Sequence, residues 1–355
     1  KQKTAYEMLR SLVGSEMCIR DSFNTVLYTG NASTSRAIDV GFSVNWAWIK
    51  QRSSTAYHQL SDSVRGANKQ LFSNADVAEN TTTSNMIKSF DSNGITIGDH
   101  NGVNANGATY VAWNWKAGTA FSNDASSTGV GTIDSAGSVN TDVGFSIVTY
   151  TGNGTAGASI AHGLGAEPKW IIAKRRNASG HWRVQHGALT YARYLSLDNT
   201  GGTGGDEPSV WHRAPTTAVF SVGENGPNVN TGTYVAYSFA EVDGYSKFGS
   251  YTGNGSVNGP FIYTGFRPAW IMIKNTDTAD DNWYMADTKR NPNNVVKQIL
   301  EANNVLAEYT TGSNKIDIVS NGFKCRDVGG NMNVSGENYI YMAFAEQPFK
   351  YANAR

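Results

Sequence analysis

Two carboxylate pairs offer the chemistry of glycoside hydrolysis. Each pair has an arginine three residues after its aspartate, and the two sets are Asp62 with Arg65 and Glu79, and Asp287 with Arg290 and Glu308. A glycosidase needs two acids roughly 5–10 Å apart across a groove. An arginine beside the aspartate favours the ionised carboxylate, which is unsuitable for a general acid. We therefore interpret Asp62–Arg65 and Asp287–Arg290 as structural ion pairs and predict no enzyme, with a polysaccharide-degrading glycosidase as the alternative.

Metal and nucleophile chemistry have weaker support in the sequence. The two cysteines, Cys18 and Cys325, have no metal-ligand spacing, and His181 and His186 lie five apart on an expected strand. A serine hydrolase would need a nucleophile elbow between a strand and a helix, and the glycine-rich stretches lack that context. Asp277, Asp280 and Asp281 share one loop and are weak calcium candidates, although a solvated turn explains them as well. We predict no metal and no cofactor.

Aromatic side chains are the remaining sign of a ligand site, because their faces stack on sugars and anchor interfaces. The chain has more tryptophans than three small cores require. Trp211 lies beside His212 and has no counterpart elsewhere in the chain. The candidate ligand-binding residues are Trp211, Trp182, Trp283 and His186, with core packing as the alternative for each tryptophan.

A tandem repeat positions these residues. The sequence Tyr-Thr-Gly-Asn occurs at Tyr28–Asn31, Tyr150–Asn153 and Tyr251–Asn254. Each copy is followed by a Trp-rich strand ending in lysine and then by a Tyr-rich strand, at nearly constant spacing. This pattern indicates one module of roughly 100 residues repeated three times. Residues shared by the modules then belong to the frame, and the middle module has His186 near the Asp position without a following arginine.

Short β-branched and aromatic runs bounded by Gly and Asn turns predict about seven strands per module. The predicted fold is all-β: three tandem antiparallel β-sandwich modules, jelly-roll or concanavalin-like. Residues 23–117 form the first module, 143–243 the second and 244–355 the third. Residues 118–142 are rich in Gly, Ser and Ala, which predicts a flexible linker.

Charge and hydropathy exclude two classes of partner. Lysine plus arginine balance aspartate plus glutamate, 29 against 29, so the chain has no basic footprint for nucleic acid. No apolar run approaches the ~18–20 residues of a membrane-spanning helix, so no membrane insertion is predicted.

Residues 1–22 fit none of the repeat pattern. They resemble a peptide found at the ends of unrelated metagenomic translations, produced by reading through sequencing-adapter DNA. We interpret them as a non-native artefact fused to a truncated reading frame, so the natural protein is expected to continue upstream of Phe23.

The rest of the chain resembles a module of marine tailed-phage structural proteins. The stretches that carry the resemblance are Asp62–Lys69, Ser89–Gly94, Ala108–Trp115, Gly244–Asn254 and Met342–Arg355. The resemblance implies a virion component, such as a tail fibre or another host-facing appendage, located on the phage particle surface. It also implies contacts with other virion proteins and with a host-surface glycan or protein, and it supplies no catalytic residues.

Phage fibres are commonly trimeric, so a homotrimer is an expectation, although no coiled-coil heptad here supports one. The predicted function is adhesion or structural display. The alternatives are the glycosidase and a purely structural spacer.

Overall fold

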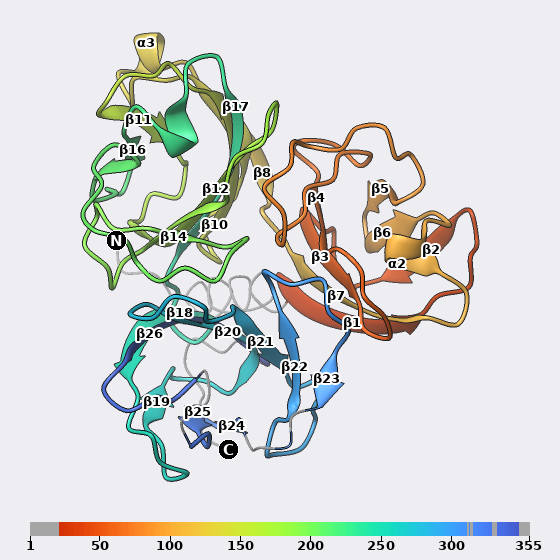
Figure 1. The fold of residues 1–355 in the computed structure, drawn as a ribbon. Coiled ribbons are helices and arrows are strands. Elements are labelled where there is room, and N and C mark those ends of the chain that lie inside the picture. The colour runs from red at the N-terminus through yellow and green to blue at the C-terminus, as the bar shows by residue number, and fades with distance from the viewer. Residues whose placement is uncertain (1–20, 311, 313–314, 329–331, 348–355) are drawn as a thin grey trace, which may run out of the picture.

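The computed structural model describes residues 21–310, 312, 315–328 and 332–347. Within them the fold is all-β, with antiparallel sheets packed as sandwiches, as predicted. Figure 1 shows three lobes around a common centre, one for each module. The expected artefact falls almost wholly outside the described residues.

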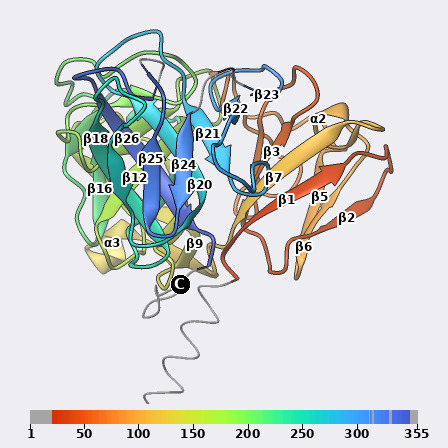
Figure 2. The ribbon, with the colours of Figure 1, turned by 90° about the horizontal axis from the view of Figure 1, so that it is seen from below.

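Module 1 has seven strands and one short helix: β1 (Phe23–Thr29), β2 (Arg36–Asp39), β3 (Trp46–Gln51), β4 (Gln59–Asp62), β5 (Ile87–Asp91), β6 (Gly94–Ile97), α2 (Asn101–Asn104) and β7 (Thr109–Trp115). Its inner sheet has the order β1-β7-β3-β4, and its outer sheet the order β2-β6-β5. The outer sheet lies on the side turned away from the other modules (Figure 2). A tight turn at Ser92 and Asn93, directly before Gly94, connects β5 to β6.

Module 2 contains β8 (Thr119–Asn123), α3 (Ala125–Thr128), β9 (Ser135–Asn140), β10 (Phe145–Thr151), β11 (Ala158–Ala161), β12 (Pro168–Arg175), β13 (Arg183–His186), β14 (Leu195–Ser196), β15 (Trp211–Arg213), β16 (Val219–Val222), η1 (Gly226–Asn228) and β17 (Thr233–Ala240). Its inner sheet has seven strands in the order β14-β13-β12-β17-β10-β9-β8. Its outer sheet is β11-β16-β15.

Module 3 contains β18 (Ser246–Thr252), β19 (Phe261–Tyr263), β20 (Pro268–Asn275), β21 (Tyr284–Asp287), β22 (Gln298–Glu301), β23 (Tyr309–Thr310), β24 (Ile316–Val319), β25 (Gly322–Cys325) and β26 (Asn338–Ala345). Its inner sheet is β18-β26-β20-β21-β22-β23, and its outer sheet is β19-β25-β24.

The central strands of the three inner sheets are buried on both faces; they are β3 and β7, β12 and β17, and β20 and β26. Along β7, Tyr110 and Ala112 face the core of module 1, whereas Val111, Trp113 and Trp115 face the molecular centre. A fourth core, shared by all three modules, fills that centre and is called the central core below. It contains eight of the nine tryptophans of the chain: Trp46, Trp48, Trp113, Trp115, Trp170, Trp182, Trp270 and Trp283.

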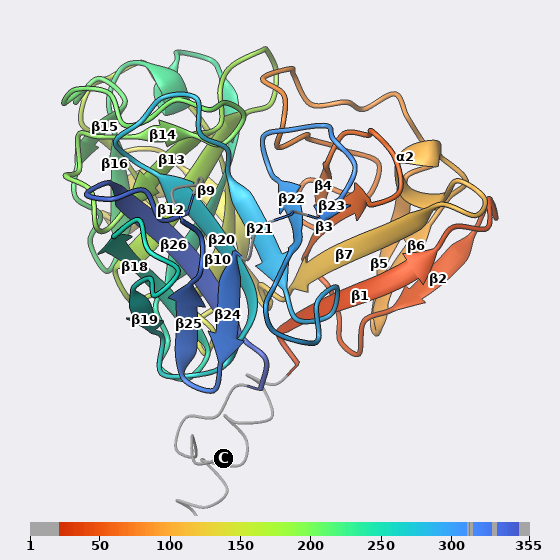
Figure 3. The same cartoon turned by 60° about the horizontal axis from the view of Figure 1, so that its bottom comes forward.

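The modules are connected in a closed ring. In each, the lysine that ends the Trp strand is buried and donates to a backbone carbonyl of another module: Lys174 to Val77 at 2.8 Å, Lys274 to Thr200 at 3.1 Å, and Lys50 to Val305 at 3.1 Å. Module 2 therefore contacts module 1, module 3 contacts module 2, and module 1 contacts module 3. Figure 3 shows this last junction, where β22 and β23 lie beside β3 and β4.

The repeated Tyr-Thr-Gly-Asn turn has a structural role in every module. Tyr28 pairs with Tyr110 across β1 and β7, and their rings stack with centroids 5.1 Å apart. The corresponding pairs in the other modules are Tyr150 with Tyr234 and Tyr251 with Tyr339. The opening and closing tyrosines of each repeat thus pack against each other, as expected for a residue of the frame.

Candidate functional site

The three candidate tryptophans lie inside the protein. Trp182, Trp211 and Trp283 are each 0 % exposed, the first and last in the central core and Trp211 in the core of module 2. Buried rings offer no face to a ligand, which contradicts the predicted binding role. The chain has more tryptophans than three separate module cores would need because eight of them fill a fourth core that the modules share.

Two of these indoles help to join modules. Nε1 of Trp182 donates to the carbonyl of Phe72 at 2.8 Å, and Nε1 of Trp283 donates to that of Ser196 at 3.0 Å. Each carbonyl belongs to the preceding module, so both tryptophans contribute to the junctions of the ring.

His186 is also buried, which contradicts its candidacy as a ligand-binding residue. Its ring lies edge-on to Trp170, with centroids 4.9 Å apart, and its Nδ1 accepts from the backbone N–H of Ala188. Burial lowers the pKa of His186 to about 3, so the imidazole is neutral at pH 7. It pairs with Trp170 as Asp62 pairs with Trp46, which confirms that it occupies the Asp position of the repeat.

The three aspartates of the calcium candidate do not converge on one point. Asp277 accepts from the backbone and side chain of Asn338, and Asp281 is buried and accepts from Tyr284. Asp280 is exposed, with φ at 71°. Among the described residues, no three His, Cys, Asp or Glu side chains lie close enough to hold a metal ion. These aspartates are therefore local turn and core residues.

The Asp–Arg pairs are confirmed as buried ion pairs. Asp62 and Arg65 are in contact at 2.5 Å, and both side chains are 0 % exposed. Arg65 also forms an ion pair with Glu79 at 2.8 Å, and Glu79 forms one with Arg176 of module 2 at 3.0 Å. The four charges form one chain across the junction of modules 1 and 2.

The junction of modules 3 and 1 repeats this arrangement. Asp287 contacts Arg290, Arg290 contacts Glu308, and Glu308 contacts Arg52 of module 1 at 2.8 Å. Both carboxylates of the glycosidase alternative are thus bound to arginines within a packed junction. They do not face each other across an open groove, as a catalytic pair would have to.

Among the described residues, the junction of modules 2 and 3 has no such ionic chain. His186 replaces the aspartate, and Leu189 stands where the other junctions have arginine and packs against the central core. The three modules are therefore alike in frame but differ at their junctions.

The stretch predicted to be a flexible linker is folded. Strand β9 pairs with β10, and β8 pairs with β9, so residues 119–140 extend the inner sheet of module 2 by two strands. Asp124 caps the short helix α3 by accepting from the N–H groups of Ser126 and Ser127, and Gly129 ends it with φ at 68°. We call residues 118–142 the insert. Its small residues allow close pairing, since a Cβ at Gly137 would lie 1.8 Å from the carbonyl oxygen of Ile147.

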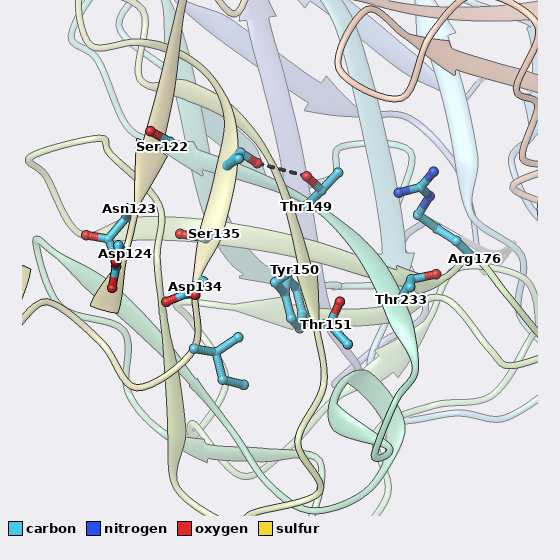
Figure 4. Close-up of a pocket in the computed structure, with 12 residues that line it drawn as sticks. Ser122, Asn123, Asp124, Asp134, Ser135, Thr149, Tyr150, Thr151, Arg176 and Thr233 are labelled. Atoms are coloured by element: carbon cyan, nitrogen blue, oxygen red, sulfur yellow. Dashed lines mark hydrogen bonds between the residues drawn. The ribbon is translucent and has the colours of Figure 1, made fainter. Parts of the chain in front are cut away.

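The insert builds one wall of an open groove of about 660 Å³. The lining residues are Ser122, Asn123, Asp124, Ile133, Asp134, Ser135, Ala136, Thr149, Tyr150, Thr151, Arg176 and Thr233. Figure 4 shows Asn123, Asp124 and Asp134 at one end, Arg176 and Thr233 at the other, and Thr149 and Thr151 between them. In the part of modules 1 and 3 that the structure describes, no strands are equivalent to β8 and β9, so among the described residues this groove belongs to module 2.

Both hydrogen-bond donors and hydrogen-bond acceptors line the groove. The exposed hydroxyls of Ser122 and Thr151 and the half-buried hydroxyl of Thr233 make no hydrogen bond within the described part of the chain. Asp134 is exposed and uses Oδ1 to accept from the N–H of Ala125, which leaves Oδ2 for a ligand. Hydrogen bonds from Ser126 and Ser127 lower the pKa of Asp124, which is ionised at pH 7.

Arg176 supplies the cationic end of the groove. Its Nε and Nη2 atoms donate to the two carboxylate oxygens of Glu79, each at 3.0 Å. This bidentate contact fixes the guanidinium plane and leaves Nη1 as a donor. Donors at one end, acceptors at the other and hydroxyls between them suit a ligand that carries many hydroxyl groups. The sequence signal that could have located the groove is the helix-cap pair Asp124 and Gly129 within the insert.

No helix of the described residues is long and apolar enough to cross a membrane.

Comparisons with known proteins identify a family but no function. No curated protein and no solved structure matches the chain. One family model, described as "Domain of unknown function (DUF7483)", matches residues 20–348. The match covers both the repeat modules and the insert, so the chain belongs to the DUF7483 family.

Proposed function

We propose that this protein is an adhesion component of a phage virion appendage, located on the particle surface, and that it binds a host-surface glycan in the groove of module 2. The observation that carries the proposal is the groove itself. It presents Asp134, Arg176 and two unbonded threonine hydroxyls on a sheet held in a closed ring. Saccharide hydroxyls both donate and accept, so they match such a mixed lining.

The rigid ring suits display on a particle, where the appendage would contact other virion proteins. Three modules with one shared core present the groove at a fixed place. The homotrimer implied by the phage resemblance remains a prediction. Sedimentation velocity of the purified chain would measure its oligomeric state.

A polysaccharide panel tests the proposal. Thr151 and Thr233 pair across β10 and β17 and both line the groove, so the double variant Thr151→Val and Thr233→Val removes two hydroxyls without changing side-chain shape. Thr29 and Thr109 pair at the same position of module 1, away from the groove, and provide the matched control.

The intact chain and the Thr29/Thr109 variant should bind the same polysaccharide, and the Thr151/Thr233 variant should bind it about tenfold more weakly. A purely structural spacer would give no binding by any of the three proteins. Equal binding by both double variants would place the site outside the groove.

A further inference from the structure

Glu79 stands behind the groove and touches its cationic end. It belongs to module 1 and does not line the groove, yet both of its carboxylate oxygens accept from Arg176. Glu79 also accepts from Arg65 Nη1 at 2.8 Å. Its side chain is 6 % exposed, whereas that of Arg176 is 19 % exposed. The guanidinium is therefore held from the inside, with its outer edge towards solvent.

Arg65, which holds Glu79 in place, is itself fixed by buried contacts. Arg65 is fully buried and bound by Asp62, and its Nη2 donates to the hydroxyl of Tyr237 at 3.2 Å. Burial raises the pKa of Glu79, but the hydrogen bond from Arg176 and the charge of Arg65 outweigh it, so the pKa falls below the ordinary 4.5. Glu79 is consequently ionised at pH 7 and balances the charge of Arg176.

We infer that Glu79 is a positioning residue for the groove: it orients Arg176 and neutralises its charge, so that the groove takes uncharged, hydroxyl-rich saccharides in preference to anionic ones. The inference rests on the proposed glycan binding and specifies its ligand class. With Arg176 balanced by Glu79, the unbalanced charges of the groove are those of Asp124 and Asp134, which repel an anionic polymer. Arg176 then acts as an oriented hydrogen-bond donor to a sugar hydroxyl.

The ring offers a matched control. Glu308 accepts from Arg52 of the next module and from Arg290 of its own, in the same arrangement as Glu79. Arg52 does not line the groove. Glu79→Gln and Glu308→Gln therefore remove equivalent contacts, and only the first one acts on the groove.

The experiment uses the full chain with dextran, mannan and galactan, each in its uncharged and its sulfated form. The intact chain should bind at least one uncharged polymer about tenfold more tightly than its sulfated form. Glu79→Gln should reduce this preference about tenfold, because Arg176 then carries an unbalanced charge and a loosened guanidinium. Glu308→Gln should leave the preference unchanged while lowering the melting temperature to a similar extent.

A second variant separates orientation from charge. Glu79→Asp keeps the negative charge but shortens the side chain, so binding to the uncharged polymer should weaken while the preference over the sulfated form remains. It also serves as the test if Glu79→Gln does not fold.

Equal effects of the Glu79→Gln and Glu308→Gln variants on the preference would overturn the positioning role, as would an intact chain that prefers a sulfated polymer. If the intact chain binds none of the six polymers, the proposed glycan function fails and this inference fails with it. Binding with an unchanged preference in Glu79→Gln rejects only the role of Glu79.

Discussion

The hydroxyl of Tyr237 in module 2 donates a 2.7 Å hydrogen bond to Oδ2 of Asp62 in module 1. Both residues are buried, and the same carboxylate oxygen is bound by Arg65. In the junction of modules 3 and 1, Nε1 of Trp113 donates to Asp287 in the same way. A central-core aromatic of one module thus completes the ion pair of another.

Removing that hydroxyl should weaken the ring. Tyr237→Phe leaves the buried carboxylate of Asp62 with one donor fewer, and we expect a loss of about 1–3 kcal/mol in the free energy of unfolding. Urea denaturation measures the change. Tyr263→Phe, which alters a tyrosine that is 63 % exposed, should leave stability unchanged. A Tyr237→Phe protein as stable as the unaltered chain would show that the contact is energetically silent.

Acid should destabilise the fold through buried histidine. Burial lowers the folded-state pKa of His186 to about 3, whereas its unfolded value is near 6.5. Below pH 6.5, His186 therefore binds a proton in the unfolded chain but not in the folded one. The free energy of unfolding consequently falls as the pH drops from 6.5 towards 3. Between pH 7 and pH 5 this one group should cost about 2 kcal/mol. Unfolding curves at the two pH values for the intact chain and for His186→Asn test this, and the variant should lose less stability on acidification.

Closure of the ring should be measurable as a coupling energy. Arg52 and Glu308 join the last module to the first, with side chains only 19 % and 11 % exposed. A double-mutant cycle with Arg52→Gln and Glu308→Gln should give a coupling of about 1 kcal/mol or more. Arg193 and Asp206, which are 48 % and 65 % exposed, provide the comparison and should couple weakly. Similar couplings for both pairs would mean that burial adds nothing to ring closure.

Strand β9 should be required for the groove and dispensable for the ring. At Gly137 an added Cβ would clash with the carbonyl of Ile147, so Gly137→Ala should separate β9 from β10 and abolish polysaccharide binding. Overpacking of this kind costs about 1–3 kcal/mol. Ala120→Val on exposed β8 serves as the control and should bind normally. Circular dichroism checks that the sandwich fold persists, and retained binding by Gly137→Ala would contradict the assigned site.

The repeat made much of the frame predictable. Aligning the repeats located the opening and closing tyrosines and the Asp62–Arg65 and Asp287–Arg290 ion pairs, because each depends on local spacing within a module. It also placed His186 at the Asp position. Each of these features occurs in more than one module, so comparing the modules shows that it is part of the repeat and not a chance match.

The central core and the groove were not predictable in the same way. A strand buried on both faces, such as β3, has the same apolar pattern whether its second face meets its own module or a neighbour. Trp182 and Trp283 therefore resembled surplus surface aromatics. In the insert, Gly and Ser are present because neighbouring strands approach closely at Gly137, and composition alone does not distinguish that role from flexibility.

The contact between Arg52 and Glu308 joins residues 256 positions apart. During synthesis, the apolar faces of modules 1 and 2 that form the central core therefore remain exposed until the last module has been made. A chain that stops after β17 would expose Trp113 and Trp115 to solvent and would be prone to aggregate. Open solenoids can lose a terminal repeat and remain folded, because each repeat contacts only its neighbours. This protein, by contrast, should reach its soluble form only as a complete set of three modules.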